Sequence, residues 1–302
     1  MRLNKYVAHY STYSRREADE TIQLGFVKVN NVVQNDPAYD VLEEDVVTLK
    51  GKILSPTEIF TVIVYNKNRG EIVTKKDEKG RKTIYDTLDK KFRHFIPVGR
   101  LDFASEGVLL LTDSSVIADA LMTSNWERVY KIKIKGSITP AMLQAMQEGI
   151  HIADATQGAH EESSIQSMTF APFAGYQIVK DTPLFSILKV SIIEGQNREL
   201  RRFFGAFDRE VVDLKRLAYG PFHLNALPNG KTRFLTRREY SDLRSYLKQL
   251  EKAKKERAKP VVETEERPKK EGKKAPTKPA PKAKKSSAEL SVQKRISPPK
   301  QK

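Results

Sequence analysis

The chain has 302 residues, a formal net charge of +16 and no cysteine, which excludes disulfides, thiol nucleophiles, thiolate zinc sites and iron–sulfur clusters. Its five histidines show no close helical spacing, so the sequence predicts no metal site. No stretch approaches the roughly 20 apolar residues of a membrane-spanning helix, and the start lacks an apolar signal core. We therefore expect a cytoplasmic protein that does not associate with membranes.

Residues 1 to 50 contain the capping and turn signals of a small, separate module. Residues 3 to 10 carry apolar side chains at helical spacing, and Ser14 with Glu17 has the spacing of a capping box, so two helices are predicted. Apolar runs between residues 26 and 49 predict a small sheet, with a turn at Asn30-Asn31.

The module carries cations where its second helix begins. Arg15 and Arg16 oppose the helix dipole there, so we expect them to serve a partner, which a phosphate backbone would satisfy. The alternative is an ordinary solvated basic face. The residues predicted to contact nucleic acid are Arg2, Lys5, Arg15, Arg16 and Lys28.

A larger domain is predicted from residue 59 to 250, after a linker at 51 to 58 that contains glycine and proline. Its strands come in runs rather than in regular alternation with helices, which favours α+β with a mixed, mainly antiparallel sheet. The predicted strands are 60–65, 108–111, 130–135, 185–193 and 211–217. Two helices are predicted to begin after caps at residues 113–115 and at Thr139-Pro140, and two more are predicted to cover 197–207 and 236–250.

An aspartate precedes the most apolar strand. Gly99-Arg100-Leu101-Asp102 forms a short turn before Val108 to Leu111, a run too continuous for an exposed strand, which we predict to be buried. Loops beside rigid strands often carry function. By itself, Asp102 could equally be a structural residue that caps the turn and pairs with Arg100.

Three segments resemble those of a known enzyme family. Gly99-Arg100-Leu101-Asp102 with the following Gly107 to Thr112 resembles the catalytic motif of the RsuA/RluB branch of pseudouridine synthases. Tyr130-Lys131-Ile132 is similar to the second motif of that branch, and Glu194 to Phe204 to the third. Ser14 to Ala18 resembles the signature of the S4 RNA-binding module that the branch carries. Together the resemblance covers about residues 1 to 240.

The resemblance implies roles for individual residues. Asp102 would be the carboxylate that attacks the sugar, adds to the uracil ring or assists elimination through a glycal, and no cofactor is needed. Arg201 would pair with Asp102, and Tyr130 would offer its ring to the base and its hydroxyl to a proton. Leu200 would form an apolar wall of the pocket. The alternatives are a phosphate contact for Arg201 and core positions for Tyr130 and Leu200.

Further arginines are expected at the substrate. A base inside a helical stack cannot reach an aspartate, so the nucleotide must be extruded at a cost of a few kcal/mol. Arg100 could stack in the vacated space or contact the flanking phosphate. Arg198 and Arg202 are predicted to bind substrate with Arg100 and Leu200.

The positive charge is concentrated at the end of the chain. Residues 252 to 302 hold 18 Lys or Arg against 6 Glu, a net of +12 out of +16. Few apolar side chains occur there, so we predict that 251 to 302 is a disordered tail. Such a polycation adds salt-sensitive affinity for nucleic acid; the alternative is a solvated tail of little consequence.

The sequence thus predicts a pseudouridine synthase that modifies ribosomal RNA. The amino-acid sequence of residues 197 to 202 resembles the RluB group, which modifies large-subunit (23S) rRNA, more than the small-subunit (16S) RsuA group. The substrate would be naked rRNA or an assembling ribosomal particle, and the protein a monomer. The main rival is a non-catalytic RNA-binding or ribosome-assembly protein. A glycosidase pairing Asp102 with Glu106 or Asp113 is disfavoured, because no aromatic platform for sugars is present.

Overall fold

The computed structural model describes residues 1 to 257 except residues 12, 43, 56–59 and 161–162. Most of the predicted basic tail and residues 56 to 58 of the predicted linker lie outside the described residues.

The N-terminal module has two helices on a four-stranded sheet of order β2-β1-β3-β4. The Ser14 hydroxyl accepts from the Glu17 amide and the Glu17 carboxylate from the Ser14 amide, so the predicted capping box is confirmed. Asn30 and Asn31 both have positive φ, 50° and 67°, which confirms the predicted turn. The elements are α1 (Leu3–Tyr10), α2 (Arg15–Gln23), β1 (Val27–Val29), β2 (Val32–Val33), β3 (Val47–Leu49) and β4 (Lys52–Ile53).

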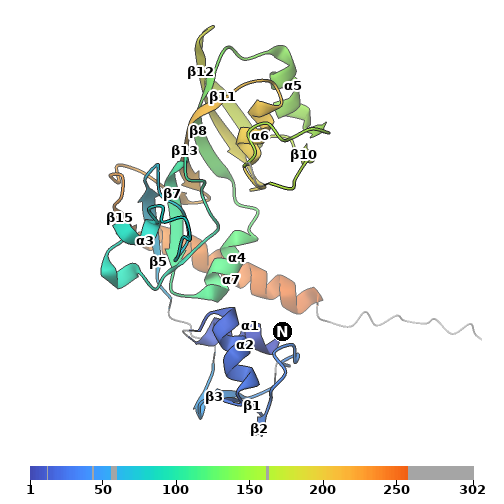
Figure 1. The fold of residues 1–302 in the computed structure, drawn as a ribbon, viewed down its shortest axis with the longest axis vertical. Coiled ribbons are helices and arrows are strands. Elements are labelled where there is room, and N and C mark those ends of the chain that lie inside the picture. The colour runs from blue at the N-terminus through green and yellow to red at the C-terminus, as the bar shows by residue number, and fades with distance from the viewer. Residues whose placement is uncertain (12, 43, 56–59, 161–162, 258–302) are drawn as a thin grey trace, which may run out of the picture. The chain divides into compact units, whose positions relative to one another are not determined.

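The remaining residues build one large sheet whose main path is β11-β12-β8-β13-β7-β5-β15 (Figure 1). Only the β13–β7 pair is parallel among its described pairs, so the predicted α+β class with a mixed, mainly antiparallel sheet is confirmed. The strands are β5 (Val62–Lys67), β6 (Ile96–Pro97), β7 (Glu106–Thr112), β8 (Arg128–Lys135), β11 (Gly175–Asp181), β12 (Phe185–Ile192), β13 (Val211–Tyr219), β14 (Phe222–His223) and β15 (Thr232–Phe234).

Helices and one hairpin cover this sheet. Ser114 caps α4, and Thr139 caps α5 with Pro140 in the first turn, as predicted. Helix α7 continues past the predicted end at residue 250, because its last residues are charged but good helix formers. The elements are α3 (Ile84–Thr87), a 3₁₀ turn (Lys90–Phe92), α4 (Ser115–Met122), α5 (Pro140–Glu148), the hairpin β9 (Ile150–Ile152) and β10 (Met168–Phe170), α6 (Glu199–Gly205) and α7 (Arg237–Arg257).

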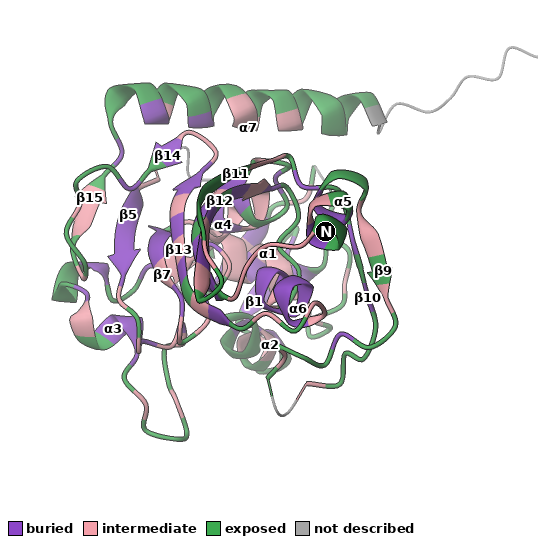
Figure 2. Cartoon of the chain, turned by 90° about the horizontal axis from the view of Figure 1, so that it is seen from above, coloured by how far each residue is buried: buried purple, intermediate pink, exposed green. Residues whose placement is uncertain are grey.

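Two apolar cores lie on the two faces of the sheet, and β7 contributes to both. Leu109 and Leu111 belong to the core that includes Tyr130, whereas Val108 and Leu110 pack with residues of α4 and α7. All four are at most 1% exposed, so the predicted burial of this strand is confirmed. Figure 2 shows the buried strands β5 and β7 beside α7, which is exposed over most of its surface. The loop that carries Asp102 is thereby joined to a strand that is buried on both faces.

Within the described ranges, every helix is too short or too polar to cross a membrane.

Candidate active site

The loop from Gly99 to Ser105, here called the Asp102 loop, connects β6 to β7. Gly99 has φ +71°, a conformation that glycine adopts at little cost. The Ser105 amide donates to the Asp102 carbonyl at 3.0 Å, which closes the turn. The Asp102 side chain remains 27% exposed, so its carboxylate can be reached from the adjoining pocket.

Lys67, at the end of β5, forms hydrogen bonds with the backbone of the Asp102 loop. Its side chain is fully buried, and its Nζ donates to the carbonyls of Asn68 at 2.9 Å, Asp102 at 3.1 Å and Ser105 at 2.8 Å. Burial lowers the pKa of Lys67 to about 8, with Glu71 and other nearby carboxylates opposing the shift. Lys67 was not identified from the sequence. The feature that could have pointed to it is the position of a lysine at the end of an apolar strand, directly before Asn68-Arg69-Gly70.

Two guanidinium groups face the Asp102 carboxylate. The Arg201 Nε lies 3.4 Å and an Arg198 Nη nitrogen 3.7 Å from the same Asp102 oxygen. Arg201 also donates to the carbonyls of Val211 at 3.0 Å and Ala104 at 3.1 Å, so it ties α6 to the Asp102 loop. Burial lowers the pKa of Arg201, and Asp102 opposes that shift. The structure therefore brings Asp102 together with Arg198 and Arg201, two of the four arginines predicted at the site.

Arg198 adopts an unusual backbone conformation. Its φ is 51° and ψ 30°, the left-handed region, and for this reason α6 begins at Glu199 rather than at the predicted residue 197. The Arg198 Nε donates to the Gly158 carbonyl at 2.7 Å. A non-glycine residue held in this region costs energy that the surroundings must supply. The Arg198 guanidinium is thereby held between Asp102 and Gly158, which lies in the connection from β9 to β10.

Arg202 does not reach the pocket. Its side chain is fully buried, and it donates to the carbonyls of Ala155, Ile165 and Asn197 and to the Ser163 hydroxyl. A substrate contact does not fit this placement, so the prediction for Arg202 is corrected. A buried guanidinium needs its donors satisfied, and the 153–167 connection supplies the acceptors.

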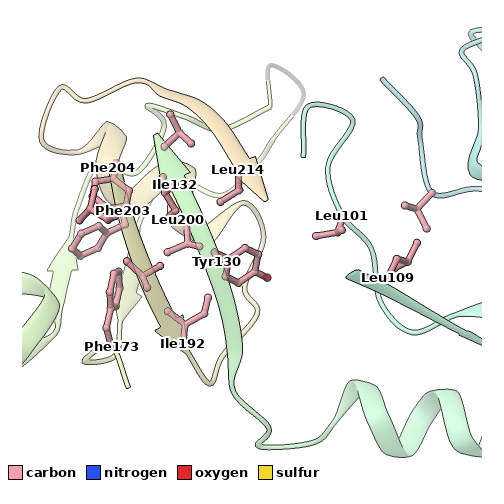
Figure 3. Close-up of a cluster of buried hydrophobic side chains, with 14 of the residues drawn as sticks. Leu101, Leu109, Tyr130, Ile132, Phe173, Ile192, Leu200, Phe203, Phe204 and Leu214 are labelled. Carbon is pink, nitrogen blue, oxygen red and sulfur yellow. The ribbon is translucent and has the colours of Figure 1, made fainter. Parts of the chain in front are cut away.

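Tyr130 and Leu200 lie on the apolar side of the site. Tyr130 comes from β8 and is 7% exposed, and Leu200 comes from α6 and is 3% exposed. Figure 3 shows the Tyr130 ring near Leu200 and Leu214, with Leu101 of the Asp102 loop across the opening. Both residues belong to the core and also line the pocket, so the two alternatives stated for them are compatible.

A pocket of about 280 Å³ joins these groups. The exposed Arg100 lies at its edge. The lining side chains named from the sequence are Arg100, Asp102, Tyr130, Arg198 and Leu200, together with Leu101, Ile192 and Leu214. A second hollow of about 540 Å³ shares Arg198 and is lined by Gly158, Arg201 and Arg209.

The cations predicted in the N-terminal module have different surroundings. Arg15, Arg16 and Lys28 are exposed, as is Arg2, whose backbone forms a bridge with Asp40. The Lys5 ammonium forms an ion pair with Asp119 of α4 at 2.7 Å. Arg15 and Arg16 are therefore the pair at the start of α2 that remains accessible.

Comparisons with known proteins identify the family. A model of the RNA pseudouridylate synthase family matches residues 61–206, and a model of the S4 domain matches residues 1–47. An uncharacterized RNA pseudouridine synthase of Helicobacter pylori is 49% identical over 249 residues, which are 82% of this chain and 95% of that protein. The chain belongs to the RNA pseudouridylate synthase family. The predicted family and the S4 module are thus confirmed.

A further relative supports this assignment, and a solved structure shares the fold. The ribosomal large subunit pseudouridine synthase B of Bacillus subtilis is 34% identical over 246 residues, 81% of this chain and 96% of that protein. A crystal structure of a pseudouridylate synthase shares the fold, with a TM-score of 0.55 and 24% identity over 80% of this chain and 99% of that one. This pseudouridine synthase is an RNA uridine isomerase, and the matched residues 61–206 contain Asp102, Tyr130 and Arg201.

Proposed function

We propose that this enzyme isomerises a uridine of ribosomal RNA, in the large subunit, with Asp102 as the reacting carboxylate. The observation that carries the proposal is the half-buried Asp102 carboxylate, which lines the pocket beside Tyr130 and is faced by Arg198 and Arg201. The reaction breaks a glycosidic bond and forms a carbon–carbon bond to the same sugar, so one ionised carboxylate suffices and no cofactor is required. The name of the Bacillus subtilis relative supports the large subunit as target.

The other residues take supporting roles in this proposal. Arg201 orients the carboxylate through its ion pair at 3.4 Å, since its own side chain is held by the carbonyls of Val211 and Ala104. Tyr130 and Leu200 hold the uracil between apolar surfaces. Arg100 and Arg198 bind the strand on either side of the extruded nucleotide, where their guanidinium groups suit phosphates.

The S4 module supports the wider substrate assignment. Its exposed Arg15 and Arg16 provide phosphate contacts outside the pocket, and RNA targets are recognised through shape and unpaired bases. We propose that a cytoplasmic monomer acts either on naked 23S rRNA or on an assembling particle. A small-subunit target is the alternative outcome of the test below.

The test is pseudouridine mapping on 23S and 16S rRNA transcripts with wild-type protein and with Asp102→Asn. We expect new pseudouridine in 23S rRNA from the wild type without added cofactor. The Asn variant should be slower by roughly 10³-fold or more, because the amide cannot act as the nucleophile or base. Asp242→Asn, at an exposed position of α7, is the matched control and should retain full activity.

Three outcomes would change the proposal. Modification of 16S rRNA alone would transfer the target to the small subunit. Full activity of Asp102→Asn would remove the role of Asp102. RNA binding by both proteins without product on naked transcripts would require the same assay on ribosomal precursor particles.

A further inference from the structure

Three neighbouring strands of the large sheet, β12, β8 and β13, carry lysines on one face. Along β8, Tyr130, Ile132 and Ile134 are buried, whereas Lys131 and Lys133 between them point to the opposite face. Figure 1 shows α5, α6 and β10 on one side of β8 and β12. The residues on the other face of these strands are exposed or half-buried. This face lies opposite the pocket, because Tyr130 lines the pocket.

Three lysines occupy neighbouring positions on this face. Lys189 of β12 is in register with Lys131 of β8, and Lys131 with Lys215 of β13. Because neighbouring strands are about 4.8 Å apart, the three backbones span about 10 Å. We call these three residues the lysine row. Like charges directly opposite one another on adjacent strands destabilise a sheet, so the row has a cost for folding.

The acids on this face neutralise one member of the row and leave the other two without an ion pair among the described residues. Glu106 forms an ion pair with Lys215 at 3.3 Å, and Asp213 is engaged by Arg69 at 2.9 Å. Among the described residues, no carboxylate lies within ion-pair distance of Lys131 or Lys189. The ammonium groups of these two lysines are therefore available to an anionic partner.

Protection of a sheet edge does not explain the row. Lysines on edge strands discourage pairing with other chains. The edge strands here are β11 and β15, whereas all three lysines of the row lie on interior strands. Edge protection therefore does not account for the two unpaired lysines of the row, Lys131 and Lys189.

The surroundings of the row favour phosphates over bases. Lys133 and Lys180 both lie over the Phe185 ring, 4.6 Å and 4.8 Å from its centroid. The aromatic ring closest in register to the row is therefore occupied by cations and is not free to stack on a nucleobase. Aligned ammonium groups without a stacking surface suit a sugar–phosphate backbone.

We propose that the lysine row binds the phosphate backbone of the RNA substrate on the face of the sheet opposite the pocket. This inference rests on the proposed function, because it takes rRNA as the ligand of the lysine row. A helix of the substrate outside the target segment docks there, and the contact reads charge and shape instead of sequence. It adds affinity and salt dependence, and it takes no part in the chemical step.

The experiment compares Lys131→Gln/Lys189→Gln with wild type in binding to a 23S rRNA transcript between 50 and 200 mM salt. Two lost phosphate contacts should raise Kd about tenfold at 0.1 M salt and reduce the slope of log K against log salt by about two. Lys248→Gln/Lys252→Gln on α7 removes the same charge from exposed positions and is the control. The melting temperature of the row variant should be unchanged or higher, because repulsion is relieved.

Two results would overturn the inference. One is a Kd and salt slope equal to wild type, which would leave this face to an acidic protein or to solvent. The other is an equal loss in the α7 control, which would reduce the effect to net charge. Conversion of RNA at saturating enzyme separates this inference from the proposed function. The row variant should convert RNA at the wild-type rate, and weakened binding without any product from wild type would refute only the proposed function.

Discussion

Lys67 shows how one buried charge can hold the backbone of the Asp102 loop without contacting the Asp102 carboxylate. Its three hydrogen bonds go to backbone carbonyls, two of which belong to the Asp102 loop. A protonated amine has three hydrogens, enough for all three acceptors, whereas a neutral amine has two. The protonation state of Lys67 therefore determines whether the loop is fully held.

This arrangement predicts opposite effects of pH on stability and on activity. The pKa of Lys67 is about 8 in the folded protein against an ordinary value of 10.5, so between these pH values the unfolded chain binds more protons. The free energy of unfolding should consequently rise with pH across this window, by up to about 3 kcal/mol from this group. The rate at saturating RNA should fall in the same window, because the loop loses a donor.

Lys67→Met is the variant that checks this prediction. It should lower the rate about 10²-fold through misplacement of Asp102, with little change in stability near pH 7, since removal of a buried charge offsets the lost hydrogen bonds. Urea unfolding from pH 7 to 10.5 should lose the rise assigned to Lys67. Lys75→Met, at an exposed site, is the control. Identical pH slopes in Lys67→Met and wild type would refute the assignment.

At the scale of elements, α6 packs closely against residues 155–158 and 163–165 of the connection from β9 to β10. A Cβ on Gly158 would lie 2.2 Å from the Arg201 carbonyl, and one on Gly205 would lie 2.8 Å from the Gln157 backbone. Arg202 joins the same two segments through its buried guanidinium. This close approach places the Gly158 carbonyl where it accepts from Arg198.

Gly158→Ala should therefore impair catalysis through Arg198. The residue has φ +74°, and the added methyl group would force the connection away from α6. We expect a loss of about 1–3 kcal/mol in stability and at least a tenfold lower rate at saturating RNA. Gly175→Ala is the matched control, because a Cβ there meets nothing within 4 Å. Lower stability with an unchanged rate would show that Arg198 does not need this support.

The elements that sequence reasoning found are those with local signals. The capping box at Ser14, the Pro140 helix start and the continuous apolar run of β7 each follow from residues adjacent in the chain. Strand β11 was missed, because it is mostly exposed and is defined by its pairing with β12. The burial of Arg202 was missed for a related reason, since most of its acceptors lie about 40 residues earlier.

At the scale of the whole molecule, the strands around Tyr130 have two unlike faces. One face carries the core and the pocket around Tyr130, whereas the opposite face of the same strands carries the lysine row. The S4 module has a core of its own, built around Leu3 and Ile22. Its exposed Arg15 and Arg16 belong to neither face of the sheet. The protein thus offers two cationic surfaces in addition to the pocket.

If one RNA contacts both surfaces at once, their contributions should add. Arg15→Gln/Arg16→Gln alone should reduce the salt slope by about two, and its combination with Lys131→Gln/Lys189→Gln by about four. Distant, independent sites give additive free energies, so the Kd values should multiply. Filter binding of the three variants to the same 23S rRNA transcript provides the measurement.

The opposite result has a distinct physical meaning. Surfaces that bind alternative segments of RNA, one at a time, would give a combined loss far greater than either single loss, because each surface substitutes for the other in the single variants. The rate at saturating enzyme separates affinity from chemistry in both cases. It should stay at the wild-type value in all three variants, because none of the four changed residues lines the pocket beside Asp102.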